Sequence, residues 1–170
     1  MLLGKYMSND LILCDMRSQK KSEVIEELAN LFVKAGVVKD KEPFSAAIRK
    51  REELESTAIG QGVAIPHGRS ESVKELKVVF ARSKNGVDFK ALDKKPVHLI
   101  FMIAAPDTVR KEYLQIVAKI ARLSKSKVMR EALLSVETAQ DVMELIQDFD
   151  NMLIEEISIK TKQGRILYRK

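Results

Sequence analysis

The sequence predicts an α/β fold, a layered sandwich in which a mixed parallel and antiparallel β-sheet is flanked by helices. Strand-like runs alternate with amphipathic helical stretches along the chain, which is typical of layered α/β proteins. The run VHLIFMIAAP at 97–106 is almost continuously apolar, as expected of a central strand covered on both faces. The length of 170 residues suits one domain, predicted at 1–150, with a basic extension at 151–170.

The first part of the chain is expected to contain one short strand, at 11–14, and two helices. Apolar residues with helical spacing predict a helix that ends at Gly36 in the C′ position: Val24, Leu28, Leu31, Phe32 and Ala35. A second helix is predicted from about Pro43 to Glu55, because proline is tolerated in a first turn. Its expected inward residues are Phe44, Ala47, Ile48 and Leu54.

The middle of the chain is expected to supply the main strands. The run KVVFAR at 77–82 reads as a strand, and the Asn85-Gly86 pair predicts a turn before the central strand. Asp107 is the predicted cap of a helix at 108–124. The expected buried residues of that helix are Leu114, Val117, Ala118 and Ala121.

Two further helices and a hairpin are expected towards the C-terminus. A short helix is predicted at 127–134, and Thr138 with Asp141 forms a capping-box pattern that opens the last helix. The inward residues of this last helix are Val142, Leu145 and Ile146. The residues EEISIKT, KQG and RILYRK at 155–170 alternate with a period of two around Gly164, which predicts a hairpin-like tail within the extension at 151–170.

The composition argues against several functional classes. Thirty basic residues are interleaved with 24 acidic ones and aromatic residues make up only 5%, so nucleic acid is not an expected partner. No run approaches the roughly 18 apolar residues of a spanning helix, and no signal peptide begins the chain, so we expect a cytoplasmic protein without direct membrane insertion. Cys14 is interpreted as a small core residue. No metal site is expected, because Cys14, His67 and His98 lack ligand-like spacing.

The segment EELESTAIGQGVAIPHG at 52–68 is the candidate functional site, because it carries a histidine between a proline and a glycine. Gly60 and Gly62 predict a turn, whose backbone amides could bind an anion, and a short strand then delivers His67. We expect Gly68 to leave the space beside the imidazole open. A neutral imidazole offers a nitrogen nucleophile when its other nitrogen is held as a donor, and we expect a backbone carbonyl to hold it.

Two polar residues outside the strand that carries His67 also call for an interpretation. Arg51 falls on the apolar face of the second helix, where a charge is costly unless it is paired. Arg51 therefore either extends its charged end out to solvent or points at an anionic site, and we favour the second. His98 lies in the central strand and is interpreted as a core or rim histidine with its hydrogen bonds satisfied.

These residues resemble the active-site signature of the fructose/mannitol class of phosphotransferase-system enzyme IIA. The matching residues are Arg51-Glu52, Thr57, Ile59-Gly60 and the run VAIPHG at 63–68. Downstream, the phrase VDFKALDKKPVHLIFMIAAP is also similar to the family. The resemblance covers roughly 11–149 and leaves the tail outside it.

The resemblance implies a phosphocarrier without a cofactor. His67 would take a phosphoryl group from HPr or an HPr-like protein and pass it to a cysteine of an enzyme IIB domain. Arg51 could bind the phosphoryl oxygens with its planar guanidinium and Thr57 with its hydroxyl.

The chain departs from the family pattern at one position and leaves the biological role open. Many relatives have a second active-site histidine in a His-Leu pair, where this chain has Tyr113-Leu114. Tyr113 can donate one hydrogen bond there but cannot become cationic near pH 7. The phosphoryl group would serve uptake of a fructose-like or mannitol-like sugar. Alternatively, the chain is a nitrogen-regulatory type whose phosphorylation state controls partner proteins.

Overall fold

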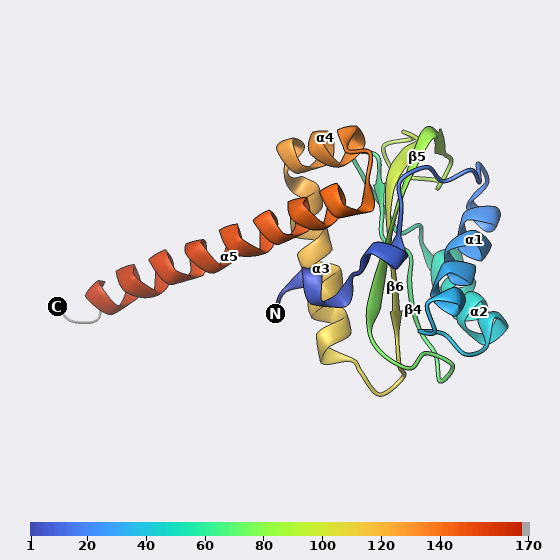
Figure 1. Cartoon of the computed structure of the whole chain (residues 1–170), viewed down its shortest axis with the longest axis horizontal. Helices are drawn as coiled ribbons and strands as arrows, with labels where there is room; N and C mark the ends of the chain where they lie inside the picture. Colours follow the sequence, from blue (N-terminus) through green and yellow to red (C-terminus); the bar gives the residue numbers. More distant parts are fainter. Residues whose placement is uncertain (168–170) are drawn as a thin grey trace.

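The computed structural model describes the backbone of residues 1–167 and the side chains of residues 1–156. Helices lie on both faces of a six-stranded sheet (Figure 1). In chain order the elements are η1 (Leu3–Tyr6), η2 (Asn9–Leu11), β1 (Ile12–Leu13), α1 (Lys21–Lys34), α2 (Lys41–Leu54), β2 (Ala58–Gly60), β3 (Val63–Ala64), β4 (His67–Arg69), β5 (Lys77–Val87), β6 (Val97–Ala105), α3 (Lys111–Lys125), α4 (Lys127–Ser135) and α5 (Ala139–Leu167).

Strand β6 is the centre of the sheet, as the apolar run predicts. The strand order is β1-β5-β6-β3-β2, and β4 also pairs with β6 beyond the end of β3. Strand β5 runs antiparallel to β6, whereas β3 and β4 run parallel to it. Strand β1 is parallel to β5, and β2 is antiparallel to β3. The predicted mixed sheet is therefore confirmed.

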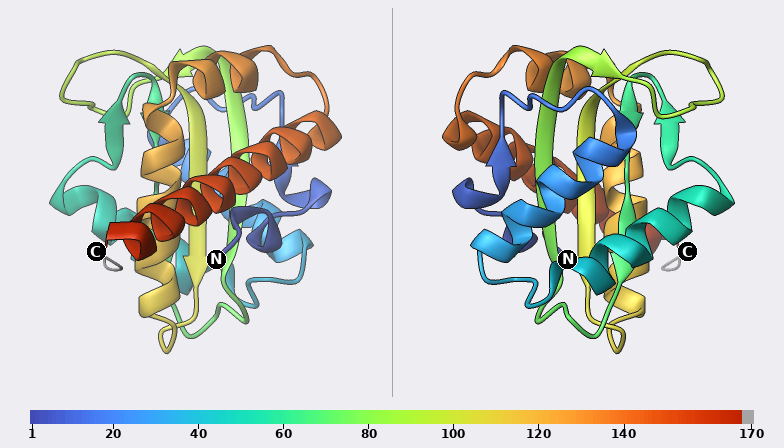
Figure 2. Two further views of the ribbon diagram at one scale, coloured as in Figure 1. Left: turned by 90° about the vertical axis from the view of Figure 1, so that its left-hand side faces the viewer. Right: turned by 90° about the vertical axis from the view of Figure 1, so that its right-hand side faces the viewer.

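Two hydrophobic cores lie on opposite faces of the sheet, which explains why β6 is apolar along its whole length. Ile100, Met102 and Ala104 pack in the core under α1 and α2. Leu99, Phe101 and Ile103 belong to the other core, under α3, α4 and α5. Successive side chains of a strand point to opposite faces, so both faces of β6 are covered by helices. The two views of Figure 2 face these two helical layers in turn.

Helices α1 and α2 lie close to their predicted positions, with one exception in their buried faces. Val24, Leu28 and Phe32 of α1 are fully buried, as expected. In α2 the predicted inward residue Leu54 is 80% exposed. The last turn of α2 extends past the core, and Glu52 is the buried residue there.

The predicted turn at Asn85-Gly86 is wrong, because β5 continues through it to Val87. Its pairing with β6 shifts register between Arg82 and Val87. Gly86 sits in this irregular stretch with φ +82°, and a Cβ there would lie 2.8 Å from the Cβ of Pro96. The glycine thus allows a bulge within the strand rather than a turn between strands.

Helix α3 begins at Lys111, three residues later than predicted, and buries a different face. Ile116, Ile120 and Leu123 are its buried apolar residues. Leu114, a predicted core residue, is 55% exposed. The apolar residues of α3 cover more than one stripe, and only the position of the sheet selects the stripe that is buried.

The C-terminal segment is helical through Leu167, so the predicted hairpin is wrong over the described residues; 168–170 lie outside them. The Thr138 hydroxyl accepts from the backbone N–H of Asp141 at 3.1 Å and caps the start of α5. The buried stripe then runs through Val142, Ile146, Phe149 and Leu153. This packing continues past 150 to Leu153, and the helix then extends away from the layers of the fold toward the C-terminus (Figure 1). An isolated two-stranded hairpin would be marginal in water.

In residues 1–167 none of the helices combines the length and hydrophobicity that crossing a bilayer requires.

Candidate functional site

Pro66 separates two short strands, and His67 is the first residue of the second. Strand β3 ends at Ala64, and β4 begins at His67, opposite Ile103 of β6. Proline has no backbone N–H, so it interrupts the ladder as a donor. Its carbonyl oxygen still accepts from the N–H of Ile103 at 2.9 Å. The backbone on both sides of the histidine is therefore tied to the central strand.

The imidazole of His67 is held by a single backbone carbonyl, as the sequence predicts. Its Nδ1 lies 2.6 Å from the carbonyl oxygen of Ile65. A carbonyl oxygen only accepts hydrogen bonds, so Nδ1 carries the proton and Nε2 keeps its lone pair.

The pKa of the His67 imidazole lies below its ordinary value near 6.5, chiefly because the ring is largely buried. The positive charge of Arg51 lowers this pKa further, whereas the Ile65 carbonyl and the Glu52 carboxylate act in the opposite direction. The ring is consequently neutral at pH 7, which is the nucleophilic form.

His67 and Arg51 line one pocket, as predicted from the two separate parts of the sequence. The pocket has a volume of about 530 Å³. Its lining residues are Arg51, Glu55, Ser56, Thr57, Ala58, Ile59, Ile65, His67, Lys90, Leu92, Val117 and Ala121. The Nη1 of Arg51 donates to the carbonyl oxygen of Glu55 at 2.8 Å. This bond fixes the guanidinium at the end of α2, beside the histidine.

Thr57 also lines the pocket, but its donors are directed elsewhere. Its hydroxyl donates to Oε2 of Glu52 at 2.6 Å, and its backbone N–H donates to Oε1 of the same carboxylate at 2.9 Å. The Nζ of Lys21 lies 2.7 Å from Oε1 of Glu52. Thr57 therefore offers no hydroxyl proton to an anion in the pocket, in contrast to the role expected from the sequence.

Gly68 does not open space beside the imidazole; it lets α2 approach the sheet. A Cβ on Gly68 would lie 3.0 Å from Cδ1 of Ile48 and 3.3 Å from the backbone nitrogen of Ile48. The expectation that this position stays empty is thus wrong. The close contact brings α2, and with it Arg51, against the strand that carries His67.

The glycine turn lies outside the His67 pocket. Gly60, Gln61 and Gly62 all have positive φ, and the N–H of Gln61 donates to the Asp93 carboxylate at 3.0 Å. Gly60 and Gln61 line a separate hollow with Arg130. The amide of Gln61 thus binds a carboxylate of this chain, and the expectation of an anion nest beside the histidine is wrong.

Tyr113 lies against His67, and Arg69 completes this side of the site. The rings of His67 and Tyr113 are 5.6 Å apart between centroids and inclined by 62°. Burial raises the pKa of the Tyr113 phenol to about 12, against the opposing influence of Arg69 and Arg51. The guanidinium carbon of Arg69 is 5.8 Å from the centroid of the Tyr113 ring. Arg69 was not among the predicted site residues. Its spacing from His67 could have identified it, because residues i and i+2 of a strand share a face.

His98 and Cys14 lie away from the pocket. The Nδ1 of His98 is 2.8 Å from the carbonyl oxygen of Ser83, and its ring is half-buried near the start of β6, as expected of a rim histidine. His98 is five residues from Ile103, the β6 partner of His67, or about 17 Å along a strand. Burial raises the pKa of the half-buried Cys14 thiol. Among the described side chains, those of residues 1–156, no three potential metal ligands gather into a site.

The sequence and the fold are both similar to those of known proteins. A family described as the phosphoenolpyruvate-dependent sugar phosphotransferase system, EIIA 2, matches residues 5–149. The fructose-specific EIIABC component of the phosphotransferase system from Bacillus subtilis is 34% identical over 150 residues, which are 88% of this chain and 24% of that protein. The chain thus spans about a quarter of that relative's length.

Two solved structures share the fold. The nitrogen regulatory protein IIA-Ntr from Neisseria meningitidis has a TM-score of 0.79 and 34% identity, over 84% of this chain and 97% of that one. A complex of enzyme IIAMTL and phosphorylated enzyme IIBMTL from Escherichia coli has a TM-score of 0.73 and 25% identity, over 84% and 97% of the two chains. With the family model covering most of its length, the chain belongs to the EIIA 2 family of the phosphoenolpyruvate-dependent sugar phosphotransferase system.

Proposed function

We propose that the chain is a phosphocarrier that holds the phosphoryl group on Nε2 of His67. The observation that carries the proposal is the bond from Nδ1 of His67 to the Ile65 carbonyl. It leaves the lone pair of Nε2 as the nucleophile at a pocket that Arg51 also lines. Membership of the EIIA 2 family supplies the reaction class.

Each transfer exchanges one bond to phosphorus for another. The lone pair of Nε2 forms a bond to the phosphorus of a phosphorylated donor, HPr or an HPr-like protein, while the bond to the donor atom breaks and leaves its electron pair there. In the second transfer a cysteine thiolate of an enzyme IIB domain bonds to phosphorus, and the electron pair of the nitrogen–phosphorus bond returns to Nε2. Neither step requires an oxidant, a metal or an added base.

Arg51 is the proposed phosphoryl-binding residue. Charge develops on the oxygens of a phosphoryl group in transfer, and positioned donors stabilise it without reorganisation. The bond of Arg51 to the Glu55 carbonyl uses one of its five N–H donors, and the rest of the fork remains for phosphoryl oxygens. Tyr113, with its pKa raised to about 12, supplies a neutral hydroxyl donor at the site-adjacent position.

The pocket mouth has apolar residues that suit docking of protein partners. Leu92 and Ile59 both line the pocket, and they are 90% and 50% exposed. Leu114, next to Tyr113, is also exposed. Large exposed apolar side chains around a reactive group favour a macromolecular donor and acceptor over a small substrate. The similar IIAMTL structure was solved with phosphorylated IIBMTL, which supports a IIB domain as the acceptor.

Regulation is the second candidate function, because the nitrogen regulatory protein IIA-Ntr is a close structural match. In that case the same phosphohistidine would control partner proteins instead of feeding sugar uptake. An adjacent pair of IIB and membrane IIC genes would favour transport.

The test is incubation with enzyme I, HPr and labelled phosphoenolpyruvate, followed by a panel of IIB proteins. We expect acid-labile labelling of the wild-type chain and of His98→Ala, and none of His67→Ala. Label that passes to a fructose-type or mannitol-type IIB identifies transport. Regulation is identified if the chain passes its label to none of the IIB proteins and if a partner protein binds only the phosphorylated or only the unphosphorylated chain. A His67→Ala protein that still accepts phosphate would disprove the assignment.

A further inference from the structure

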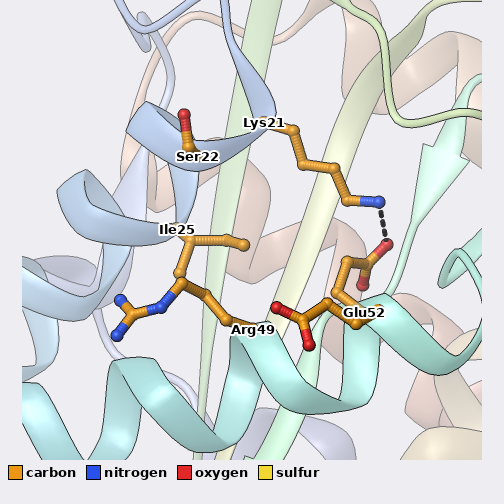
Figure 3. A pocket seen from close by; sticks show the side chains of 6 residues that line it. Lys21, Ser22, Ile25, Arg49 and Glu52 are labelled. Atoms are coloured by element: carbon orange, nitrogen blue, oxygen red, sulfur yellow. Dashed lines mark ion pairs between the residues drawn. The ribbon is translucent and has the colours of Figure 1, made fainter.

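An ion pair between the partly exposed Lys21 and the buried Glu52 lies between the first two helices. Figure 3 shows the two side chains reaching toward each other from α1 and α2, with 2.7 Å between Nζ and Oε1. The Glu52 side chain is only 4% exposed. The pair borders a hollow of about 430 Å³ that Ser22, Ile25 and Arg49 also line.

This pair is poorly placed to serve helix stability. Lys21 is the first residue of α1, and Glu52 lies in the last turn of α2. The macrodipole of each helix disfavours a cation at the N-terminus and an anion at the C-terminus. Burying the Glu52 carboxylate, with the Lys21 side chain partly buried beside it, also costs desolvation energy that their attraction often fails to recover. Stability of the helices alone therefore gives no reason for these two residues.

The contacts of the Glu52 carboxylate provide a different reason. One oxygen accepts from the Thr57 hydroxyl, and the other accepts from the Thr57 N–H and the Lys21 ammonium group. Every donor bond of Thr57 thus ends on this one carboxylate. The Lys21 ammonium supplies the positive charge that balances this buried carboxylate, which would otherwise have only the two Thr57 donors as partners.

A continuous series of hydrogen bonds leads from Glu52 to the imidazole. The carbonyl oxygen of Thr57 accepts from the N–H of Ile65 at 3.0 Å. The carbonyl oxygen of Ile65 then accepts from Nδ1 of His67 at 2.6 Å. The carboxylate therefore fixes Thr57, Thr57 fixes Ile65, and Ile65 fixes the tautomer and orientation of the ring.

We propose that Glu52, neutralised by Lys21, is a positioning residue for His67: through Thr57 and Ile65 it holds the imidazole with Nδ1 protonated and Nε2 free. The proposal deepens the phosphocarrier function and rests on it. Thr57 acts in the same series, as the residue that transmits the position of the carboxylate to the strand before His67.

The test measures the His67 tautomer by ¹⁵N NMR of the imidazole in the unphosphorylated protein, and single-turnover phosphoryl transfer from HPr. Glu52→Gln keeps the side-chain shape but leaves one acceptor oxygen where the carboxylate has two. We expect it to populate the second tautomer and to slow transfer by about tenfold to a hundredfold, as misplacement of a reacting group does. Thr57→Val removes only the hydroxyl donor. It should change the tautomer population and the transfer rate in the same direction as Glu52→Gln, but by a smaller amount.

Two further variants separate positioning from folding. Lys21→Met keeps both carboxylate oxygens as acceptors but leaves the carboxylate without its countercharge. It should therefore lower the melting temperature and leave His67 mainly in the wild-type tautomer. Lys21→Met with Glu52→Gln removes both charges, so it should recover stability while the tautomer stays mixed. If the tautomer and the rate instead follow the melting temperature across the set, the pair is only structural and the proposal is overturned.

The matched control is Lys41→Met, because Lys41 pairs with Glu26 at 3.1 Å between the same two helices on the protein surface. It should leave both the tautomer and the rate unchanged. A folded Glu52→Gln protein with the wild-type tautomer and rate would also refute the proposal. The tautomer is measured without phosphate, so it still decides the question if the wild-type chain takes no label from HPr, a result that would refute the phosphocarrier function instead.

Discussion

Nδ1 of His67 lies 2.6 Å from the carbonyl oxygen of Ile65, a residue only two positions earlier in the chain. The bond closes within the Ile65-Pro66-His67 segment, and the Thr57 carbonyl in turn holds this segment by accepting from the Ile65 N–H at 3.0 Å. The Nδ1 bond keeps the ring in one tautomer whether or not a partner protein is present. The lone pair of Nε2 is therefore free in the chain without a bound partner.

The first prediction concerns stability and pH. The pKa of His67 is lowered in the folded state, so between that value and about 6.5 the unfolded chain binds a proton that the folded chain does not. The free energy of unfolding should accordingly fall as pH decreases through this window and should receive its full contribution from His67 above it. Replacement of His67 by Gln should flatten this part of the curve. Chemical denaturation of both proteins from about pH 5 to about pH 8 measures the difference; curves that remain parallel would contradict the lowered pKa.

The second prediction concerns Arg51. Arg51→Lys keeps the positive charge but removes the planar fork, so transfer from HPr should slow by about tenfold or more, equivalent to about 1.4 kcal/mol. Arg49→Lys is the control, because Arg49 lies on the same helix and pairs with Glu26 and Glu42. That variant should transfer at the wild-type rate. Equal rates for the two variants would show that Arg51 does not bind the phosphoryl group.

The third prediction concerns Tyr113. With a pKa near 12 the phenol stays neutral throughout the physiological range, whereas a histidine in its place would titrate. Phosphorylation of Tyr113→His should therefore gain on wild type at about pH 6 relative to about pH 8, because an imidazolium beside the phosphoryl group stabilises it. Tyr113→Phe keeps the ring beside His67 and should show no such gain. A flat ratio of variant to wild type across this range would mean that Tyr113 only packs against the site.

The fourth prediction concerns Gly68. A methyl group there would press on the backbone of α2 at Ile48, so Gly68→Ala should destabilise the fold by about 1–3 kcal/mol. The same displacement moves Arg51 away from His67, so transfer should also slow. Gly4→Ala is the control, since its new Cβ would meet its nearest neighbour at an ordinary 3.4 Å. Thermal unfolding and transfer assays on both variants test the steric argument; a Gly68→Ala protein as stable as Gly4→Ala would refute it.

The order of the elements could be predicted from the sequence because it depends on local periodicity. The stripe of α1, the two-sided apolar strand β6 and the Thr138 cap are all encoded within one or two helical turns or one strand. The chemical character of the turn at His67 is equally local, since proline, histidine and the Ile65 carbonyl are neighbours in the chain.

Local periodicity could not predict which side chains are buried or which residues contact each other across the fold. Leu54 and Leu114 fit a helical stripe as well as the residues that are buried, and only the positions of the sheet and the neighbouring helices leave them exposed. The period-two pattern after 150 suited a strand, but the stripe that α5 buries extends past this point and the chain continues as a helix.

By itself the sequence determined the fold class and the candidate residues His67 and Arg51 that line one pocket, because each of these follows from residue types at short spacing. Only the tertiary structure decided that Gly68 seats a helix, that Thr57 faces Glu52, and that Lys21 neutralises that carboxylate. Lys21 and Glu52 are 31 positions apart in the chain. No periodicity links residues at such a distance; their contact exists because α1 and α2 pack side by side on one face of the sheet.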